Sequence, residues 1–171
     1  MNLLNVLKEK YINNAHFLSK EDFCNIYKYP FLIGFENNKN EFLDTKSPTI
    51  IGKTLEEIEE DYNKSVKISL IFPVIKRNKN PFLKKITIGR SSLQDISIQD
   101  MTVSKFHAYF YNDENKYYLV DNNSTNGTFV NNVRIEPDKS ILINDKDIMM
   151  FSTLKFIFYL PETAYEIFKI Q

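Results

Sequence analysis

The chain has 171 residues, with 22 Lys and Arg against 22 Asp and Glu, so its formal net charge is zero. Hydrophobic residues make up 43% and charged residues 26%, which is typical of a folded globular protein and excludes a wholly disordered or fibrous chain. Without net charge, nothing pulls the whole molecule toward nucleic acid or an anionic membrane, so any anion must bind at a local site. The length allows one ordinary domain with an extension.

The sequence does not indicate export or membrane insertion. Residues 1–7 are apolar but lack the basic start and the small-residue cleavage site of a secretory signal. No apolar run approaches the roughly 18 to 20 residues that span a bilayer. The single Cys24 cannot form an internal disulfide, which fits a reducing compartment. We therefore expect a cytoplasmic protein that contacts no membrane.

The first 65 residues predict short helices joined by polar connections. Ser19 and Asp22 have the spacing of a capping box, so a short helix is expected to begin there and to end before Pro30. The buried face of this helix is predicted to carry Phe23, Ile26 and Tyr27.

Two more elements are predicted in this N-terminal part. Residues 31–33 form a predicted strand that ends in a turn at Gly34. A second capping box, Thr54 with Glu57, predicts an amphipathic helix with an acidic face toward water. Its apolar side chains are Leu55, Ile58 and Tyr62. We expect the N-terminal part to pack on the rest of the chain, because amphipathic helices need a surface to bury.

From residue 66 onward the pattern changes to short segments rich in β-branched and aromatic residues. The predicted strands are 66–75, 86–88, 96–98, 108–111, 117–120, 128–130, 147–151 and 154–160. Short strands at this spacing predict a β-sandwich or a barrel. After Pro161, a short helix is predicted to cover the sheet with Ala164, Tyr165 and Phe168.

Two polar clusters stand at the ends of predicted strands. Gly89 and Arg90 directly follow the strand at 86–88, and Ser104 and Lys105 come shortly before a later strand. A hydroxyl, cationic side chains and the backbone amides of a turn are the groups that bind a phosphate dianion. Taken singly, each cluster has an ordinary explanation, namely a surface arginine paired with an acid and a solvated turn.

A third cluster is centred on Asn126-Gly127, a strong signal for a hairpin turn, because both residues tolerate a positive φ. A tight turn explains this pair without any function, but it does not require Ser124 and Thr125 before it. His107, next to a predicted strand, is expected to be a hydrogen-bonded structural histidine and neither a catalyst nor a ligand.

These clusters, in this order and spacing, resemble the forkhead-associated (FHA) domain, a phosphothreonine-peptide recognition module. The resemblance extends over about residues 66–160. It rests on Gly-Arg at 89–90, Asp-Ile-Ser-Ile at 95–98, Val-Ser-Lys-Phe-His-Ala at 103–108, Ser-Thr-Asn-Gly-Thr-Phe-Val-Asn at 124–131 and Asp-Ile at 147–148. It implies an all-β fold, a twisted antiparallel sandwich of two sheets of the SMAD/FHA type. Residues 1–65 would then be a mainly helical extension packed on the sandwich, and residues 161–171 a C-terminal helix.

The resemblance also implies which residues form the site. Those that would bind a phosphopeptide are Arg90, Ser104, Lys105, Thr125 and Asn126. Those that would support the site are Gly89, His107 and Gly127. Ser104 would donate its hydroxyl to the phosphate, Arg90 and Lys105 would supply positive charge, and the Asn126 amide would hold the peptide main chain.

Three positions depart from the family pattern. Asn132, Lys146 and Ser152 stand where many members have glycine. Asparagine tolerates a left-handed conformation, so the turn at Asn131-Asn132 can be kept. The other two changes are expected to alter the local shape of loops distant from the phosphate-binding groups.

Two other classes of function were weighed against phosphopeptide binding. A scaffold could keep the sandwich and bind a partner without phosphate through another face. An enzyme could use Cys24 with His16, or Ser104 with His107, but neither pair has an oriented third group or a Gly-rich nucleophile elbow. Cys24 is instead expected to be a buried small hydrophobe within its helix.

The sequence carries no phosphate-binding P-loop, zinc-ligand pair, carboxylate cluster or basic stripe. We therefore expect no cofactor, no metal, no nucleic-acid partner and no enzymatic activity. The expected partner is a phosphothreonine-containing protein, the substrate of a Ser/Thr kinase. The oligomeric state is left open.

Overall fold

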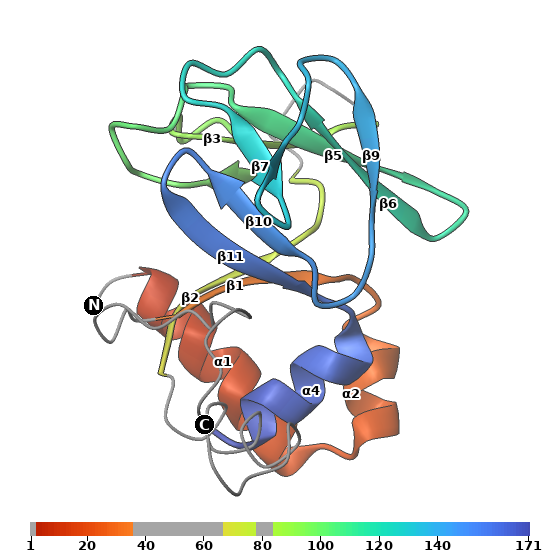
Figure 1. The fold of residues 1–171 in the computed structure, drawn as a ribbon. Coiled ribbons are helices and arrows are strands. Elements are labelled where there is room, and N and C mark those ends of the chain that lie inside the picture. Colours follow the sequence, from red (N-terminus) through yellow and green to blue (C-terminus); the bar gives the residue numbers. More distant parts are fainter. Residues whose placement is uncertain (1–2, 36–66, 78–83) are drawn as a thin grey trace, which may run out of the picture.

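The computed structural model describes residues 3–35, 67–77 and 84–171, which form three layers (Figure 1). Sheet A, with six strands, is the middle layer; sheet B, with five strands, covers one of its faces, and helices cover part of the other. The elements are α1 (Leu3–Phe17), α2 (Lys20–Ile26), β1 (Phe31–Phe35), β2 (Ile68–Pro73), β3 (Ile86–Gly89), β4 (Ile96–Ser97), β5 (Ala108–Asp113), β6 (Lys116–Asp121), β7 (Thr128–Val130), β8 (Val133–Arg134), β9 (Ser140–Ile143), β10 (Ile148–Phe151), β11 (Leu154–Tyr159) and α4 (Pro161–Lys169).

The two sheets confirm the predicted β-sandwich. Sheet A has the strand order β2-β1-β11-β10-β7-β8, and sheet B has the order β4-β3-β5-β6-β9. The described strand pairs are antiparallel except β3 with β4, which run parallel. β1 lies between β2 and β11, so the N-terminal part of the chain supplies an inner strand of sheet A.

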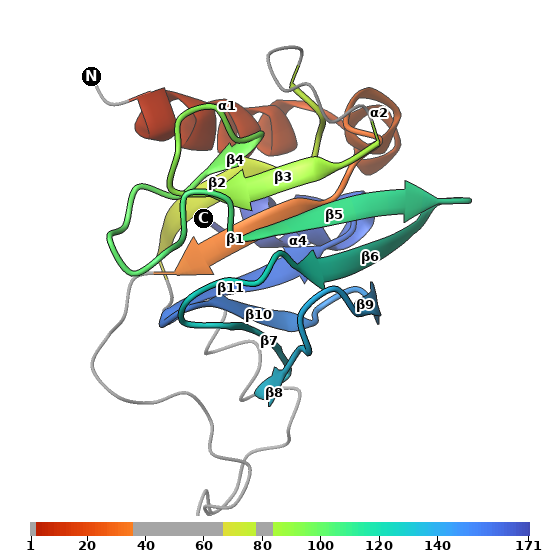
Figure 2. The same cartoon turned by 90° about the horizontal axis from the view of Figure 1, so that it is seen from above.

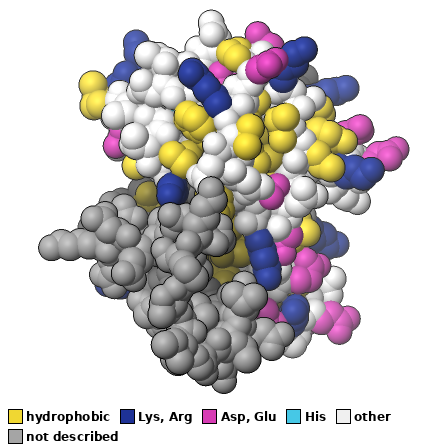
Figure 3. Space-filling view, viewed as in Figure 1, with side chains coloured by type: hydrophobic (Ala, Val, Ile, Leu, Met, Phe, Trp, Pro, Cys, Tyr) yellow, Lys and Arg dark blue, Asp and Glu magenta, His cyan; other side chains and the backbone are white. Residues whose placement is uncertain are grey.

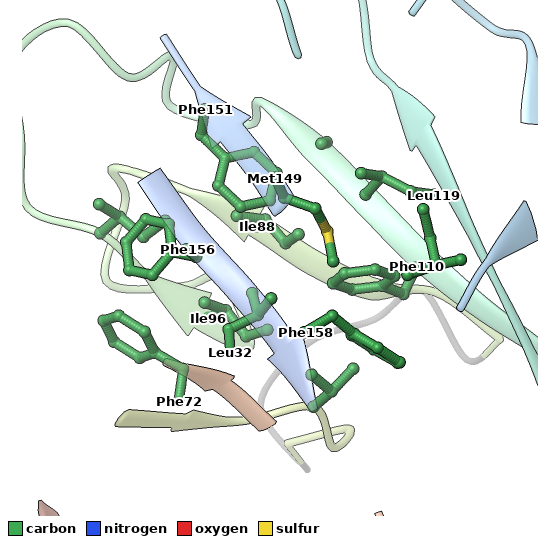
Figure 4. Close-up of a cluster of buried hydrophobic side chains, with 14 of the residues drawn as sticks. Leu32, Phe72, Ile88, Ile96, Phe110, Leu119, Met149, Phe151, Phe156 and Phe158 are labelled. Atoms are coloured by element: carbon green, nitrogen blue, oxygen red, sulfur yellow. The ribbon is translucent and has the colours of Figure 1, made fainter. Parts of the chain in front are cut away.

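Alternate side chains of sheet A point to its opposite faces, as the two-residue period of a strand requires. In β11, Phe156 and Phe158 join the core between the sheets, whereas Ile157 and Tyr159 face the helices. Leu32 of β1 also lies in the core between the sheets (Figure 4). One sheet therefore contributes to two separate hydrophobic cores.

The second core, between sheet A and the helices, is mainly aromatic; we call it the helical-layer core. Phe23, Phe31 and Phe168 are fully buried in it. The rings of Phe31 and Phe168 meet edge to face with centroids 5.4 Å apart, and Tyr11 of α1 contacts both rings. Such ring pairs add to the free energy gained by burying the rings. The helices are thus packed on the sandwich through α1, α2 and α4 together (Figure 2).

The short helix predicted after Ser19 is confirmed as α2. The Ser19 hydroxyl accepts a hydrogen bond from the Asp22 backbone N–H at 3.1 Å, which is the expected N-cap contact. Phe23 and Tyr27 are buried, but the prediction was wrong for Ile26, whose side chain is 56% exposed. The buried face of α2 follows the spacing of four residues from Phe23 to Tyr27, and Ile26 lies beside this narrow face.

The C-terminal helix is confirmed as α4, which begins at Pro161 and buries Ala164, Tyr165 and Phe168. Its first turn is held by Asp145 from the loop between β9 and β10. This carboxylate accepts hydrogen bonds from the Leu160 N–H at 2.7 Å and from the Thr163 hydroxyl at 2.6 Å. Across the described ranges, every helix is too short or too polar to cross a membrane.

Gly34 lies within β1, where a turn had been predicted, and pairs with Leu70 of β2. A Cβ atom at this position would stand 3.2 Å from the Phe156 ring, so glycine leaves room for that ring in the core. Two strands of the structure, β8 and β9, were not predicted at all. The helix predicted from Thr54 falls outside the described residues.

Candidate functional site

Three loops meet at one end of the sandwich (Figure 2). They connect β3 to β4, β4 to β5, and β6 to β7, and they carry all the predicted site residues apart from Gly89, which ends β3. The loops meet because β3 and β6 run toward this end, while their antiparallel neighbour β5 begins there. Sheet topology thus places residues 90, 104 and 126 at the same end.

The first two loops are joined through their backbones at Gly89. The Arg90 N–H donates to the Ser104 carbonyl at 2.9 Å, and the Ser91 N–H donates to the Lys105 carbonyl at 3.3 Å. A Cβ atom on Gly89 would stand 2.4 Å from the Lys105 carbonyl oxygen. Only glycine therefore permits this close approach of the two backbones.

Arg90 and Lys105 supply the positive charge of this end. The Arg90 guanidinium is half-buried, and its Nε donates to the Val103 carbonyl at 3.3 Å, which fixes the orientation of the group. Lys105 is exposed. Among the residues described, no carboxylate forms an ion pair with either side chain. The ordinary explanation of Arg90 is that it pairs with an acidic side chain. The described residues provide no such partner.

Ser104 connects the second loop to the third. Its hydroxyl accepts a hydrogen bond from the Thr125 N–H at 3.1 Å and lies 3.4 Å from the Thr125 Oγ1. Asn126 makes a second connection, since its Nδ2 donates to the Thr102 carbonyl at 2.7 Å. The Asn126 side chain is exposed, and no hydrogen bond to its Oδ1 is found among the residues described, so this oxygen is a potential contact.

His107 lies beneath these loops, fully buried. Its Nδ1 accepts a hydrogen bond from the Ser104 N–H at 3.1 Å, and its Nε2 donates to the Gly127 carbonyl at 3.2 Å. Burial lowers the pKa of His107, so the imidazole is neutral, as these two bonds require. The ring also packs edge-on against Phe151. His107 therefore ties the second loop to the third.

Asp121, which the sequence reasoning assigned no role, shapes the third loop. Its buried carboxylate accepts hydrogen bonds from the Ser124 N–H at 3.0 Å, the Ser124 hydroxyl and the Thr128 hydroxyl. An Asp followed three residues later by Ser is typical of a turn closed by the carboxylate, and this signal could have identified the role.

Gly127 closes the same loop with a φ of 86°, the left-handed conformation that glycine adopts without strain. Its carbonyl accepts a second hydrogen bond, from the Ser152 N–H at 3.1 Å. Ser152 is thus in direct contact with the loop that carries Asn126, although the sequence suggested a position distant from the site. Ser152 has a φ of 62°.

The other two departures from the family pattern also adopt left-handed backbone conformations. Asn132 has a φ of 66° and Lys146 a φ of 69°. Asparagine visits this region readily, whereas lysine is strained there. At these positions, where many family members have glycine, the left-handed turn conformation is thus adopted by asparagine, lysine and serine.

The side chains of Ser104 and His107, one of the two pairs considered for catalysis, are not hydrogen-bonded to each other. The Ser104 hydroxyl bonds to Thr125, and only the backbone of Ser104 reaches His107. Cys24 and His16 belong to the helical layer, where partial burial raises the pKa of the Cys24 thiol. Within the described part of the chain, no three His, Cys, Asp or Glu residues gather to hold a metal ion.

The two-sheet β-sandwich with hydrogen-bonded loops at one end defines a class of binding domain. The comparison with protein-family models identifies the family. Residues 86–152 match the family model of the FHA domain, so this part of the chain is an FHA domain. The matched region begins at β3 and ends just after β10, and includes all three loops of the candidate site.

Similar proteins include the oxoglutarate dehydrogenase inhibitor of Corynebacterium jeikeium, 36% identical over 70 residues, which are 41% of this chain and 46% of that protein. The glycogen accumulation regulator GarA of Mycobacterium tuberculosis is 39% identical over 62 residues, 36% of this chain and 37% of that protein. The chain thus matches less than half the length of these relatives. Among solved structures, full-length yeast Pml1p aligns with a TM-score of 0.49 at 20% identity. The alignment covers 84% of this chain and 94% of the Pml1p chain.

Proposed function

We propose that this chain is a phosphothreonine-dependent protein interaction module that acts by binding and catalyses no reaction. The observation that carries the proposal is the arrangement at the loop end, where Arg90, Ser104 and Lys105 converge without a described counter-charge. A phosphate dianion offers three acceptor oxygens and about two negative charges near neutral pH. The braced loops would hold these donors in place before the ligand arrives.

Thr125 and Asn126 complete the proposed site beside the phosphate-binding groups. The Asn126 side chain is exposed and anchored at one end only, so it can bond the main chain of a bound peptide. Thr125 is exposed next to Ser104, where a ligand methyl group could pack. Gly89, His107 and Gly127 would act from beneath, through the backbone contacts described above.

The proposed partner is a protein that a Ser/Thr kinase has phosphorylated. Two similar proteins carry the names inhibitor and regulator, which supports regulation through binding. In this proposal, residues 66–160 form the FHA unit together with β1, and the helices α1, α2 and α4 form a support on sheet A. The module is proposed to work without a cofactor or metal, in the cytoplasm.

The proposal is tested with one peptide sequence that carries phosphothreonine, phosphoserine or plain threonine. Burial of the threonine methyl is worth about 0.8 kcal/mol or somewhat more. Phosphothreonine should therefore bind at least several-fold more tightly than phosphoserine, and plain threonine should not bind measurably. Titration calorimetry measures all three. Equal affinity for the three peptides would favour the phosphate-independent scaffold.

A matched pair of variants locates the site. Arg90→Ala should abolish measurable phosphopeptide binding while the protein stays folded, because part of the phosphate charge is then left unpaired. Lys28→Ala removes an equal charge from an exposed position between α2 and β1 and should bind like the parent protein. Wild-type affinity in Arg90→Ala would refute the site assignment.

A further inference from the structure

A hollow on the outer face of sheet B is lined by cations and tyrosines and lies apart from the loop end. Its volume is about 680 Å³, and it lies over the start of β3 and the far half of β5. Lys84, Lys85, Tyr109 and Tyr111 are among its lining residues. None of the proposed phosphate-binding residues belongs to it.

The charge of this hollow is positive. Lys76, at its edge, is neutralised by Asp95, whose buried carboxylate it meets at 3.0 Å. Lys84 and Lys85 have no ion-pair partner among the residues described, and Asp113 is the acidic residue of the lining. Asp113 is itself paired in register with Lys116 across the β5–β6 hairpin. An anionic occupant is therefore favoured over a cationic one.

Aromatic side chains continue the hollow across sheet B. The Lys85 ammonium lies 3.9 Å from the centroid of the Tyr109 ring, a cation–π contact that holds the lysine over the sheet. Next along the same face, the rings of Tyr111 and Tyr118 are stacked with their centroids 4.9 Å apart. These rings give this face of sheet B an aromatic surface against which an extended backbone can pack.

The same face leads to the loop end. The Phe106 ring, directly after Lys105, meets the Tyr109 ring at a centroid distance of 6.2 Å, and Tyr109 in turn lies under Lys85. From His107 to Tyr111 the chain of β5 extends for roughly 13 Å at about 3.3 Å per residue. An extended peptide anchored at the loops needs about four residues to reach the hollow.

We propose that the hollow binds an acidic stretch of the same polypeptide that presents the phosphothreonine, about four to six residues away from it. This inference rests on the proposed function and adds the class of sequence that the module selects. Carboxylates of the stretch would face Lys84 and Lys85, and its backbone would pack against the tyrosines. Exposed ion pairs are individually weak, so the gain is expected to be selectivity and not a second independent site.

The test compares three phosphothreonine peptides that differ in one segment: a neutral peptide, one with three acidic residues on the N-terminal side, and one with them on the C-terminal side. One of the acidic peptides should bind about five- to ten-fold more tightly than the neutral peptide at low salt, and this gain should shrink at high salt. In Lys84→Ala/Lys85→Ala the gain should vanish, while the neutral peptide binds as before. The control Lys28→Ala/Lys139→Ala removes the same charge elsewhere and should keep the gain.

The outcomes separate the two proposals. If the neutral phosphopeptide binds but neither acidic peptide binds more tightly, the hollow has no such role and the proposed function stands. If no phosphopeptide binds, the proposed function fails; an unphosphorylated acidic peptide that still depends on Lys84 and Lys85 would then support the hollow alone. A single-stranded oligonucleotide that displaces the acidic segment from the hollow would overturn the peptide assignment in favour of nucleic acid.

Discussion

The loop end and the helical layer of this protein are held together in different ways. At the loop end, buried His107 and Asp121 hold polar segments by hydrogen bonds, several of them to backbone groups. In the helical layer, Phe23, Phe31 and Phe168 are buried among other rings. Hydrogen bonds are directional and fix positions, whereas hydrophobic burial is non-directional and mainly supplies stability.

This difference predicts that the two regions respond differently to mutation. Changes in the helical layer should lower the free energy of unfolding and leave peptide affinity intact. Changes beneath the loops should alter both quantities, because the bonds that stabilise the loops also set the geometry of the site.

The largest loss of stability is expected for Phe168→Ala. This ring is fully buried against Tyr11, Phe23 and Phe31, and removing it leaves a cavity that should cost about 3–5 kcal/mol. Denaturant unfolding measures the loss. The control is Phe17→Ala, since that side chain is 87% exposed and should change stability by less than about 0.5 kcal/mol. Lost phosphopeptide affinity in folded Phe168→Ala would contradict the separation of the two regions.

His107→Ala should cost about 1–3 kcal/mol, because the Ser104 N–H and the Gly127 carbonyl lose their partner inside the protein. Phosphopeptide affinity should fall with it, since the second and third loops are no longer joined. His16→Ala, at an exposed position on α1, is the matched control. If binding is lost while the melting temperature is unchanged, His107 is instead a direct ligand of the peptide.

The pH dependence of stability should reveal the same histidine. Burial depresses the pKa of folded His107, whereas in the unfolded chain a histidine titrates near its ordinary value of about 6.5. Below that pH the unfolded state binds more protons than the folded state, so stability declines as pH falls. Unfolding curves from about pH 8 to pH 5 should show a shallower decline in His107→Asn than in the parent protein. Identical slopes would show that folding does not shift the pKa of His107.

The smallest effect is expected at Lys146, in the turn between β9 and β10, where its backbone N–H donates to the Phe158 carbonyl of β11. Its φ of 69° strains a lysine, so Lys146→Gly should stabilise the protein by about 0.5 kcal/mol, after subtraction of the entropy that glycine loses on folding. Lys139 itself does not have a positive φ, so Lys139→Gly should not stabilise the protein. Phosphopeptide affinity should be unchanged in both variants. A loss of stability in Lys146→Gly would contradict the strain argument.

The sequence predicted the sandwich because short segments rich in β-branched and aromatic residues follow one another at close intervals. It missed β9, where Ile141 and Leu142 are partly exposed at the sheet edge and do not alternate. The helix α1 was not delimited, although Tyr11 and Ala15 lie four residues apart on its buried face. The limits of β9 and α1 depend on contacts with elements distant in the sequence. Such contacts leave little trace in the local residue pattern.

The site shows the same limit. The family motifs indicated Arg90, Ser104 and Asn126, and topology brings these residues to one end. The motifs did not indicate how Asn126 is anchored on Thr102, nor that Ser152 contacts Gly127. These hydrogen bonds join residues that lie far apart in the sequence. A local sequence motif therefore cannot reveal them.

The position of β1 in sheet A has a consequence for synthesis of the protein. Ile33 of β1 pairs with Ile157 of β11, so the two strands lie roughly 120 residues apart in the chain. At translation rates of about 5–20 residues per second, β1 leaves the ribosome several seconds before that partner exists. During this interval its apolar residues have no sheet to join on that side. A nascent chain stalled just before β11 should therefore be digested at β1 by a protease that spares the completed protein.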